Sequence, residues 1–255
     1  MTRLDRAFLG APLAHRALHD VTQGRPENSR AAIRAAINHG YGIEIDLQLS
    51  RDSTAMVFHD YDLERLTGQK GPIQQSDAID LAQVNLSGGN EGIPTLAEVL
   101  DLVAGQVPLL IELKDQNGQM GPTDGRLERA AADALGPYKG AVGVMSFNPD
   151  MVAQMANLVP DVPRGLITCG FPEADWSLLR ADIRDRLRDI PDYIRVGATF
   201  LSHQAADLNR ARVAALKAQG ADILCWTVRS PKEEAAARRV ADNVTFEGYL
   251  AAFPA

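Results

Sequence analysis

Two carboxylates alternate with apolar residues in the stretch from Ile43 to Leu47, where Glu44 and Asp46 stand two positions apart. In a strand, this spacing puts both acidic side chains on one face and the isoleucines on the other. Two carboxylates at such a short distance repel each other unless a cation lies between them or they share a proton. The stretch therefore predicts a metal site, although an edge strand with solvated acids has the same pattern and a single E-x-D pair is common by chance.

Histidines, cations and a third carboxylate recur at the ends of other apolar, strand-like runs. They are His15, Arg16, His59, Glu112 and Lys114. Oxygen ligands suit Mg²⁺ or Ca²⁺, arginine and lysine suit a phosphate group, and histidine exchanges protons near neutral pH. By residue type, the set indicates a metal-assisted phosphate site with two groups for proton transfer.

Strand-like runs alternate with amphipathic helices along most of the chain, which is typical of a parallel sheet built from βαβ units. We expect eight strands, at residues 13–15, 43–48, 108–113, 142–146, 164–168, 196–202, 223–228 and 244–246. A chain of 255 residues suits one α/β barrel domain spanning residues 1–255. Catalytic groups of such barrels lie at the carboxyl ends of strands, and the candidate residues fall at or near these ends.

The alternation breaks between Ser50 and Pro94, where turn residues separate short apolar runs. We expect an insertion at residues 51–94, after the second strand, that carries His59 over the mouth of the barrel and forms one wall of the pocket. Asp60 next to it would orient this histidine or belong to a turn, rather than bind metal. Regular structure resumes at Thr95, which forms a capping box with Glu98 at the start of a helix.

The chain resembles the glycerophosphodiester phosphodiesterase family in an ordered set of short motifs. They are His15-Arg16, Pro26-Glu27-Asn28, Glu44-Ile45-Asp46, His59-Asp60, Ile93-Pro94-Thr95-Leu96, Ile111-Glu112-Leu113-Lys114 and Cys225-Trp226-Thr227-Val228. The resemblance implies a (β/α)8 TIM barrel with a small insertion after the second strand. It also implies a metal-dependent phosphodiesterase that hydrolyses glycerophosphodiesters to glycerol 3-phosphate and an alcohol.

The implied roles follow the matched positions. The metal ligands would be Glu44, Asp46 and Glu112, the catalytic residues His15 and His59, and the substrate-binding residues Arg16, Lys114, Trp226 and Glu27. The metal would be Mg²⁺ or Ca²⁺. One histidine would activate the nucleophile and the other would protonate the leaving alkoxide, in an order that the sequence leaves open. The nucleophile would be water or the neighbouring glycerol hydroxyl, by way of a cyclic phosphate.

Several assignments have a structural alternative, and the chain also departs from the family. Glu27 equally suits a first-turn acid at a helix N-terminus, and Trp226 equally suits barrel filling. Ala17 stands where glycine is usual, residues 18–24 lengthen the first loop, and Thr-Phe-Glu-Gly at residues 245–248 replaces a usual Thr-Asp. We expect the first two departures to alter backbone near the site and the third to leave the matched residues intact.

Composition narrows the range of partners. A net charge of −7 and a pI of about 5.3 argue against nucleic acid or an anionic membrane surface, so the expected partner is a small-molecule glycerophosphodiester. No apolar stretch is long enough for a stable membrane anchor, and we expect a cytoplasmic protein whose oligomeric state is open, a homo-oligomer included. Cys169 and Cys225 lie in apolar runs and are expected to be buried thiols rather than a disulfide.

Two other functions fit the same residues. One is a lysophospholipase D-like or phosphoinositide phosphodiesterase on the same scaffold, which would need an apolar surface beside the pocket. The other is a barrel that binds a phosphorylated ligand without catalysis. Intact histidines and carboxylates count against the second.

Overall fold

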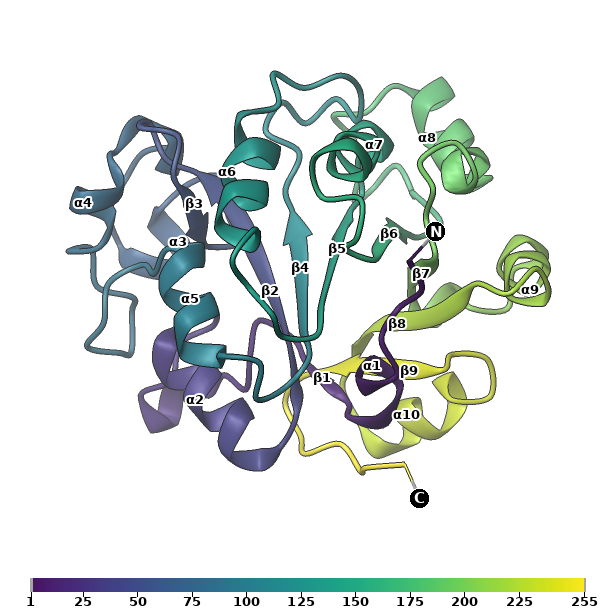
Figure 1. Cartoon of the computed structure of the whole chain (residues 1–255), viewed down its shortest axis with the longest axis horizontal. Coiled ribbons are helices and arrows are strands. Elements are labelled where there is room, and N and C mark those ends of the chain that lie inside the picture. The colour runs from purple at the N-terminus through teal and green to yellow at the C-terminus, as the bar shows by residue number, and fades with distance from the viewer. Residues whose placement is uncertain (1, 255) are drawn as a thin grey trace.

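The computed structural model describes residues 2–254, which form a closed barrel (Figure 1). Within these residues, the parallel strands are β1 (Leu13–Ala14), β2 (Gly42–Leu49), β4 (Leu109–Leu113), β5 (Val142–Ser146), β6 (Arg164–Thr168), β7 (Phe200–Gln204), β8 (Asp222–Val228) and β9 (Asn243–Phe246). The strand β1 pairs with both β2 and β9, and this double pairing closes the ring. The fold is the expected (β/α)8 TIM barrel.

Helices follow the strands and form the outer layer of the barrel (Figure 1). They are α2 (Arg30–His39), α5 (Leu96–Val103), α6 (Arg126–Leu135), α7 (Pro149–Leu158), α8 (Ala181–Arg188), α9 (Ala211–Ala218) and α10 (Pro231–Ala237). Side-chain caps fix where several begin. Ser29 accepts from the backbone N–H of Ala32 at the start of α2, and the capping box of Thr95 and Glu98 opens α5 as expected.

Apolar side chains fill the barrel interior at the amino-terminal ends of the strands. Phe8, from the short helix α1 (Ala7–Gly10), and Phe200, from β7, are fully buried there. A Cβ atom at Gly165 would lie 2.2 Å from the Phe200 ring, so the glycine on β6 makes room for this large side chain. Because apolar side chains fill this end, the polar residues of the interior lie toward the carboxyl ends of the strands.

The insertion begins where β2 extends beyond the barrel. This extension pairs antiparallel with β3 (Ala55–Val57), with Leu47 opposite Val57 and Leu49 opposite Ala55. The hairpin returns the chain to the carboxylate strand, where the N–H of Phe58 donates to the carbonyl of Asp46 at 3.0 Å. His59 is thereby placed over the mouth of the barrel.

The remainder of the insertion is small and has its own apolar cluster. It contains α3 (Glu64–Thr67), the 3-10 helix η2 (Ile73–Gln75) and α4 (Ala78–Leu81), which lie to one side of the ring in Figure 1. Its buried residues are Met56, Phe58, Leu63, Leu66, Ile73, Leu81, Val84, Leu86 and Ile93.

One strand differs from its expected position. The expected strand at residues 196–202 is wrong in its first half, because β7 begins at Phe200 and runs to Gln204. The preceding residues form the 3-10 helix η3 (Pro191–Tyr193) and a turn at Gly197, whose φ of +61° suits glycine. The apolar residues Val196 and Ala198 are buried in this turn, so their hydrophobicity marked packing rather than a strand.

Two further expectations concern the cysteines and the membrane. Cys169 and Cys225 are buried free thiols, as expected. Among residues 2–254, no helix combines the length and the apolar character needed to cross a bilayer.

Candidate active site

Three carboxylates meet on the inner face of β2 and β4. Glu44 and Asp46 share one face of β2, and the strand register sets Asp46 opposite Glu112. One carboxylate oxygen from each residue lies within 4.8 Å of the others, and all three residues are buried. An all-oxygen donor set of this kind suits Mg²⁺ or Ca²⁺.

The electrostatics of the three carboxylates favour a bound cation. Burial, followed by the charges of Asp46 and Glu112, raises the pKa of Glu44 well above its usual value. Burial also raises the pKa of Glu112, against the opposing effect of Lys114. Burial acts in the same direction on Asp46, but Lys114, His59 and Arg16 outweigh it and hold the pKa of Asp46 below its usual value. A divalent cation among these groups would relieve the repulsion on Glu44 and Glu112, so the residues present fit a metal.

Lys114 is a buried cation attached to the same carboxylates. Its Nζ lies 2.7 Å from Oε1 of Glu112 and 2.8 Å from Oδ1 of Asp46. These two carboxylates outweigh the effect of burial and raise the pKa of Lys114, which keeps the ammonium group charged. Lys114 also lines the pocket.

Arg16 approaches the carboxylates from β1. Its backbone N–H donates to Oε2 of Glu44 at 2.9 Å, and its Nε lies 3.7 Å from Oδ2 of Asp46. Arg16 and the following Ala17 have positive φ angles of 51° and 64°, the left-handed conformation that favours glycine. The alanine at the family's glycine position thus takes the backbone shape that a glycine takes easily.

His15 lies directly after β1 and is held by a carboxylate from the other end of the chain, which follows the neighbouring strand β9. Its Nδ1 lies 2.5 Å from Oε2 of Glu247, just after β9, while Oε1 of Glu247 accepts from Nε of Arg229 at 2.7 Å. The hydrogen bond from His15 is the main cause that holds the pKa of Glu247 low. Burial lowers the pKa of His15, against the opposing effect of Glu247, and this favours the neutral imidazole. Because the Glu247 carboxylate can only accept a hydrogen bond, Nδ1 of His15 donates to it and the lone pair lies on Nε2.

His59 has a matching arrangement on the insertion. Its Nδ1 lies 2.6 Å from Oδ1 of Asp60, and Oδ2 of Asp60 accepts from Nε of Arg65 at 2.6 Å. The bonds from His59 and Arg65 outweigh the effect of burial and hold the pKa of Asp60 below its usual value. Asp60 therefore orients the histidine, as we expected for it.

Glu27 lies behind the site rather than on its surface. Its carboxylate accepts from Nη1 of Arg16 at 2.8 Å and from both terminal nitrogens of Arg65 at 2.8 and 2.9 Å. It therefore joins Arg16 to the Asp60 side of the site. The residue expected to bind substrate is placed to hold the guanidinium group of Arg16.

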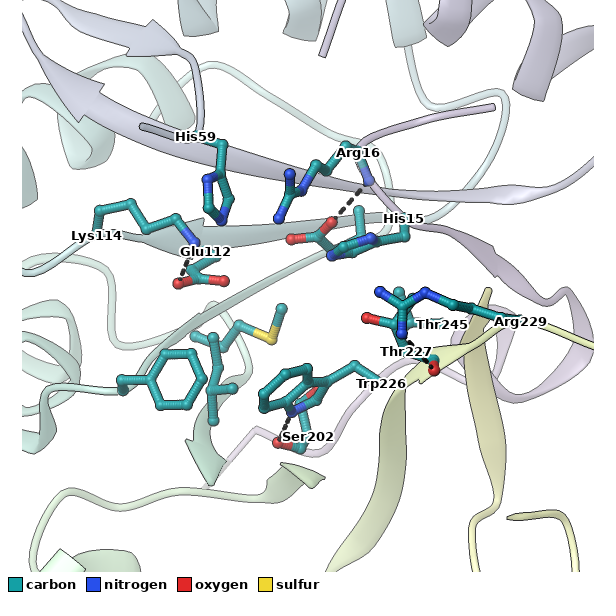
Figure 2. A pocket seen from close by; sticks show the side chains of 14 residues that line it. His15, Arg16, His59, Glu112, Lys114, Ser202, Trp226, Thr227, Arg229 and Thr245 are labelled. Atoms are coloured by element: carbon teal, nitrogen blue, oxygen red, sulfur yellow. Dashed lines mark hydrogen bonds and ion pairs between the residues drawn. The ribbon is translucent and has the colours of Figure 1, made fainter. Parts of the chain in front are cut away.

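The opposite end of the pocket is aromatic and hydroxylic. Figure 2 shows His59, Lys114 and Glu112 at one end and Trp226, Thr227, Arg229 and Thr245 at the other. Trp226 is half-buried, its Nε1 donates to the carbonyl of Ser202 at 3.0 Å, and its ring meets that of Phe147 edge to face. The lining hydroxyls of Ser202 and Thr245 are buried and make no hydrogen bond within residues 2–254. The pocket has a volume of about 160 Å³.

The other histidines lie outside this arrangement. His203 is fully buried between the hydroxyl of Thr168 and the carbonyl of Asp207. Nε2 of His19 lies 3.8 Å from Oε2 of Glu247, at the rim. His39 bonds the carbonyl of Ala35 within α2, in keeping with its expected structural role.

Sequence reasoning overlooked the residues that hold the named ones in place. The departure at residues 245–248 was expected only to leave the matched positions intact, but its Glu247 contacts His15 directly. Asn28, whose Nδ2 donates to Oδ2 of Asp46 at 2.9 Å, was noted only within a motif. The signal for Glu247 was present in its unusual Thr-Phe-Glu-Gly context, whereas nothing in the sequence connects Arg65 or Arg229 to the histidines.

Comparison with known proteins agrees with this geometry. A family model described as "Glycerophosphoryl diester phosphodiesterase family" matches residues 15–245. The "Putative glycerophosphodiester phosphodiesterase YhdW" of Bacillus subtilis (strain 168) is 27% identical over 219 residues, which are 82% of this chain and 84% of that protein.

Two solved structures have a similar fold. A phosphodiesterase from Oleispira antarctica, in complex with the product sn-glycerol-3-phosphate, has a TM-score of 0.75 and 24% identity over 94% of each chain. A glycerophosphodiester phosphodiesterase from Parabacteroides distasonis has a TM-score of 0.71 and 25% identity, covering 93% of this chain and 94% of its own.

Proposed function

The chain belongs to the glycerophosphoryl diester phosphodiesterase family, and from that premise we propose that it is a metal-dependent enzyme that hydrolyses glycerophosphodiesters to glycerol 3-phosphate and an alcohol. One observation carries the proposal. A buried set of three carboxylates, two cations and two histidine–carboxylate pairs converge on a single pocket. The product bound by the Oleispira antarctica phosphodiesterase supports the same assignment.

The metal would be held by Glu44, Asp46 and Glu112, whose oxygen donors suit Mg²⁺ or Ca²⁺. When bound, it would offset negative charge that develops on the phosphate oxygens. Arg16 and Lys114 supply fixed positive charge beside the same position. Their pairing with Glu27, Asp46 and Glu112 keeps both cations in place before the substrate arrives.

The enclosed end of the pocket would take the glycerol group. Its small volume suits three carbons, the half-buried ring of Trp226 offers an apolar face, and the hydroxyls of Ser202 and Thr245 have free hydrogen-bonding capacity. Thr227 and Arg229 line this end as well, and Arg229 is connected to His15 through Glu247. Glycerol would thus lie on the His15 side of the phosphate.

This placement assigns the two proton-transfer roles. His15, whose neutral form is favoured by burial, would accept at Nε2 a proton from the attacking hydroxyl, either water or the 2-hydroxyl of the bound glycerol. His59 also lines the open cleft beyond the phosphate and would protonate the leaving alkoxide there. The carboxylates Glu247 and Asp60 would fix the Nδ1 tautomer of each ring and stabilise its charged form.

The test is a turnover assay with a panel of diesters. Glycerophosphodiesters with different alcohols should release glycerol 3-phosphate only when Mg²⁺ or Ca²⁺ is added to chelator-treated protein. Lysophospholipid and phosphoinositide substrates in the same assay should react poorly, because the glycerol end of the pocket is small. Hydrolysis of those lipids in preference to glycerophosphodiesters would replace the proposal with the alternative activity, and the absence of any turnover would leave a binding protein.

A further inference from the structure

A second, wider cleft opens from the catalytic pocket on the His59 side. Its volume is about 590 Å³, and it shares His59, Glu112, Lys114 and Phe147 with the catalytic pocket, while His15 and Trp226 do not line it. Its walls come from the insertion, the loop after β4, the end of β5 and the loop after β6. A diester with glycerol beside Trp226 would therefore direct its other substituent, the leaving alcohol, into this cleft.

Aromatic rings form part of the cleft wall. Trp176, in the loop after β6, packs against Phe147 with ring centroids 5.0 Å apart and remains partly exposed. Tyr61 is half-exposed on the insertion, and its hydroxyl donates to the carbonyl of Asp115 at 2.7 Å, which fixes the ring at the rim. Rings that are held in place and open to solvent on one side offer π faces to a cation.

The charged residues that line the cleft also favour a cation. Asp62, Asp115 and Asp175 line it, and within residues 2–254 none of the three has a cation within ion-pair distance. Of the described residues that line the cleft, Lys114 is the one lysine or arginine, and its ammonium group is paired with Asp46 and Glu112. These three aspartates therefore favour a positively charged alcohol in the cleft and disfavour an anionic one.

We propose that this cleft selects a leaving alcohol that carries an ammonium group, a choline-like amino alcohol in chemical terms. The inference rests on the proposed phosphodiesterase function and adds the class of alcohol to it. Trp176 and Asp175 are the specificity residues, the first by its ring face and the second by its charge.

The test compares two diesters of glycerol 3-phosphate that differ in one charge. One carries choline, and the other carries 3,3-dimethylbutanol, which replaces the nitrogen with carbon at nearly the same shape. We expect the kcat/KM of the choline diester to be about tenfold higher, the size of a favourable cation–π contact. Trp176→Leu should bring this ratio close to one, and Asp175→Asn should lower it about threefold.

Glu173→Gln is the matched control. Glu173 is an exposed acid in the same loop, it does not line the cleft, and its substitution should leave the ratio unchanged. A wild-type ratio near one, with both diesters turned over, would overturn the cleft assignment and leave the phosphodiesterase function standing. Equal effects of Glu173→Gln and Asp175→Asn would also overturn it, since general surface charge would then explain the preference. Failure to hydrolyse either diester with added metal would instead refute the proposed function itself.

Discussion

The two histidines of the site are held by matching devices that come from different parts of the chain. On one side, His59 bonds Asp60 and Asp60 bonds Arg65, all within seven consecutive residues of the insertion. On the other, His15 bonds Glu247 from beyond the last strand, and Glu247 bonds Arg229. We call these two hydrogen-bonded chains the His59 arm (His59, Asp60, Arg65) and the His15 arm (His15, Glu247, Arg229). Each connects an imidazole to a carboxylate and the carboxylate to a guanidinium group.

The arms differ in what lies beyond the arginine. Arg65 also bonds Glu27, which bonds Arg16, so the His59 arm continues to a cation that lines the pocket, beside the proposed phosphate position. Arg229 is 60% exposed, and its arm ends at solvent. The comparison teaches that damage to the His59 arm should reach substrate binding as well as proton transfer, whereas damage to the His15 arm should act mainly through proton transfer by His15.

The largest expected effect concerns the metal site that both arms depend on, because in the proposed mechanism both histidines act on a phosphate bound by the metal that the carboxylates would hold. Asp46→Asn or Glu44→Gln removes an anionic ligand, and we expect kcat/KM to fall about a thousandfold, since a metal supplies several kcal/mol of charge stabilisation. Chelation of the wild type should have the same result. Titration calorimetry with Mg²⁺ and Ca²⁺ measures the lost affinity, with the exposed Asp133→Asn as control. Undiminished turnover after exhaustive chelation would refute the metal site.

The next effect separates the two histidines by role. His15→Ala and His59→Ala should each lower kcat about a hundredfold or more, as expected for a general acid or base. An aryl phosphodiester leaves readily without protonation, so the loss from His59→Ala should shrink with this substrate while the loss from His15→Ala persists. Measuring both variants on both substrates checks the assignment. If the pattern were reversed, His59 would be the base.

A smaller effect compares the carboxylates of the two arms. Glu247→Gln should lower kcat about tenfold with a smaller change in KM, because His15 loses its charged partner, whereas Arg229, which also loses that charge, is mostly exposed to solvent. Asp60→Asn should lower kcat and also raise KM, because Arg65 and, through Glu27, Arg16 lose a fixed neighbour. Steady-state kinetics of the two variants with one diester is the measurement.

The pH profile gives this comparison a second readout. Glu247 raises the pKa of His15 against the stronger lowering effect of burial. Removing its charge disfavours the imidazolium ion, so the pKa of His15 should fall and the acidic limb of kcat/KM should move to lower pH in Glu247→Gln. A purely structural role for Glu247 would lower activity without moving that limb.

Sequence patterns predicted the parts of the site that are local in the chain. Period-two carboxylates predicted the inner face of β2, and the adjacent His59 and Asp60 form the expected pair. The bond between His15 and Glu247 spans 232 positions, and no periodic pattern connects residues so far apart. The contact between Phe147 and Trp176 in the cleft wall was not predicted for the same reason. These residues come from separate loops that meet only when the barrel closes.

The smallest expected effect concerns Trp226, at the glycerol end of the pocket and away from both arms. Its ring is half-buried, its Nε1 is anchored on Ser202, and it packs on Phe147, so it has both a packing role and a surface that faces the pocket. Trp226→Phe keeps most of the apolar volume, and the free energy of unfolding should fall by less than the roughly 3–5 kcal/mol expected for a tryptophan replaced by alanine. If the ring contacts glycerol, this variant should lose about threefold to tenfold in kcat/KM for a glycerophosphodiester and less for an aryl phosphodiester that lacks glycerol. Equal losses on both substrates, together with a lowered melting temperature, would assign the tryptophan to packing alone and leave the hydroxyls of Ser202 and Thr245 as the candidates for reading glycerol.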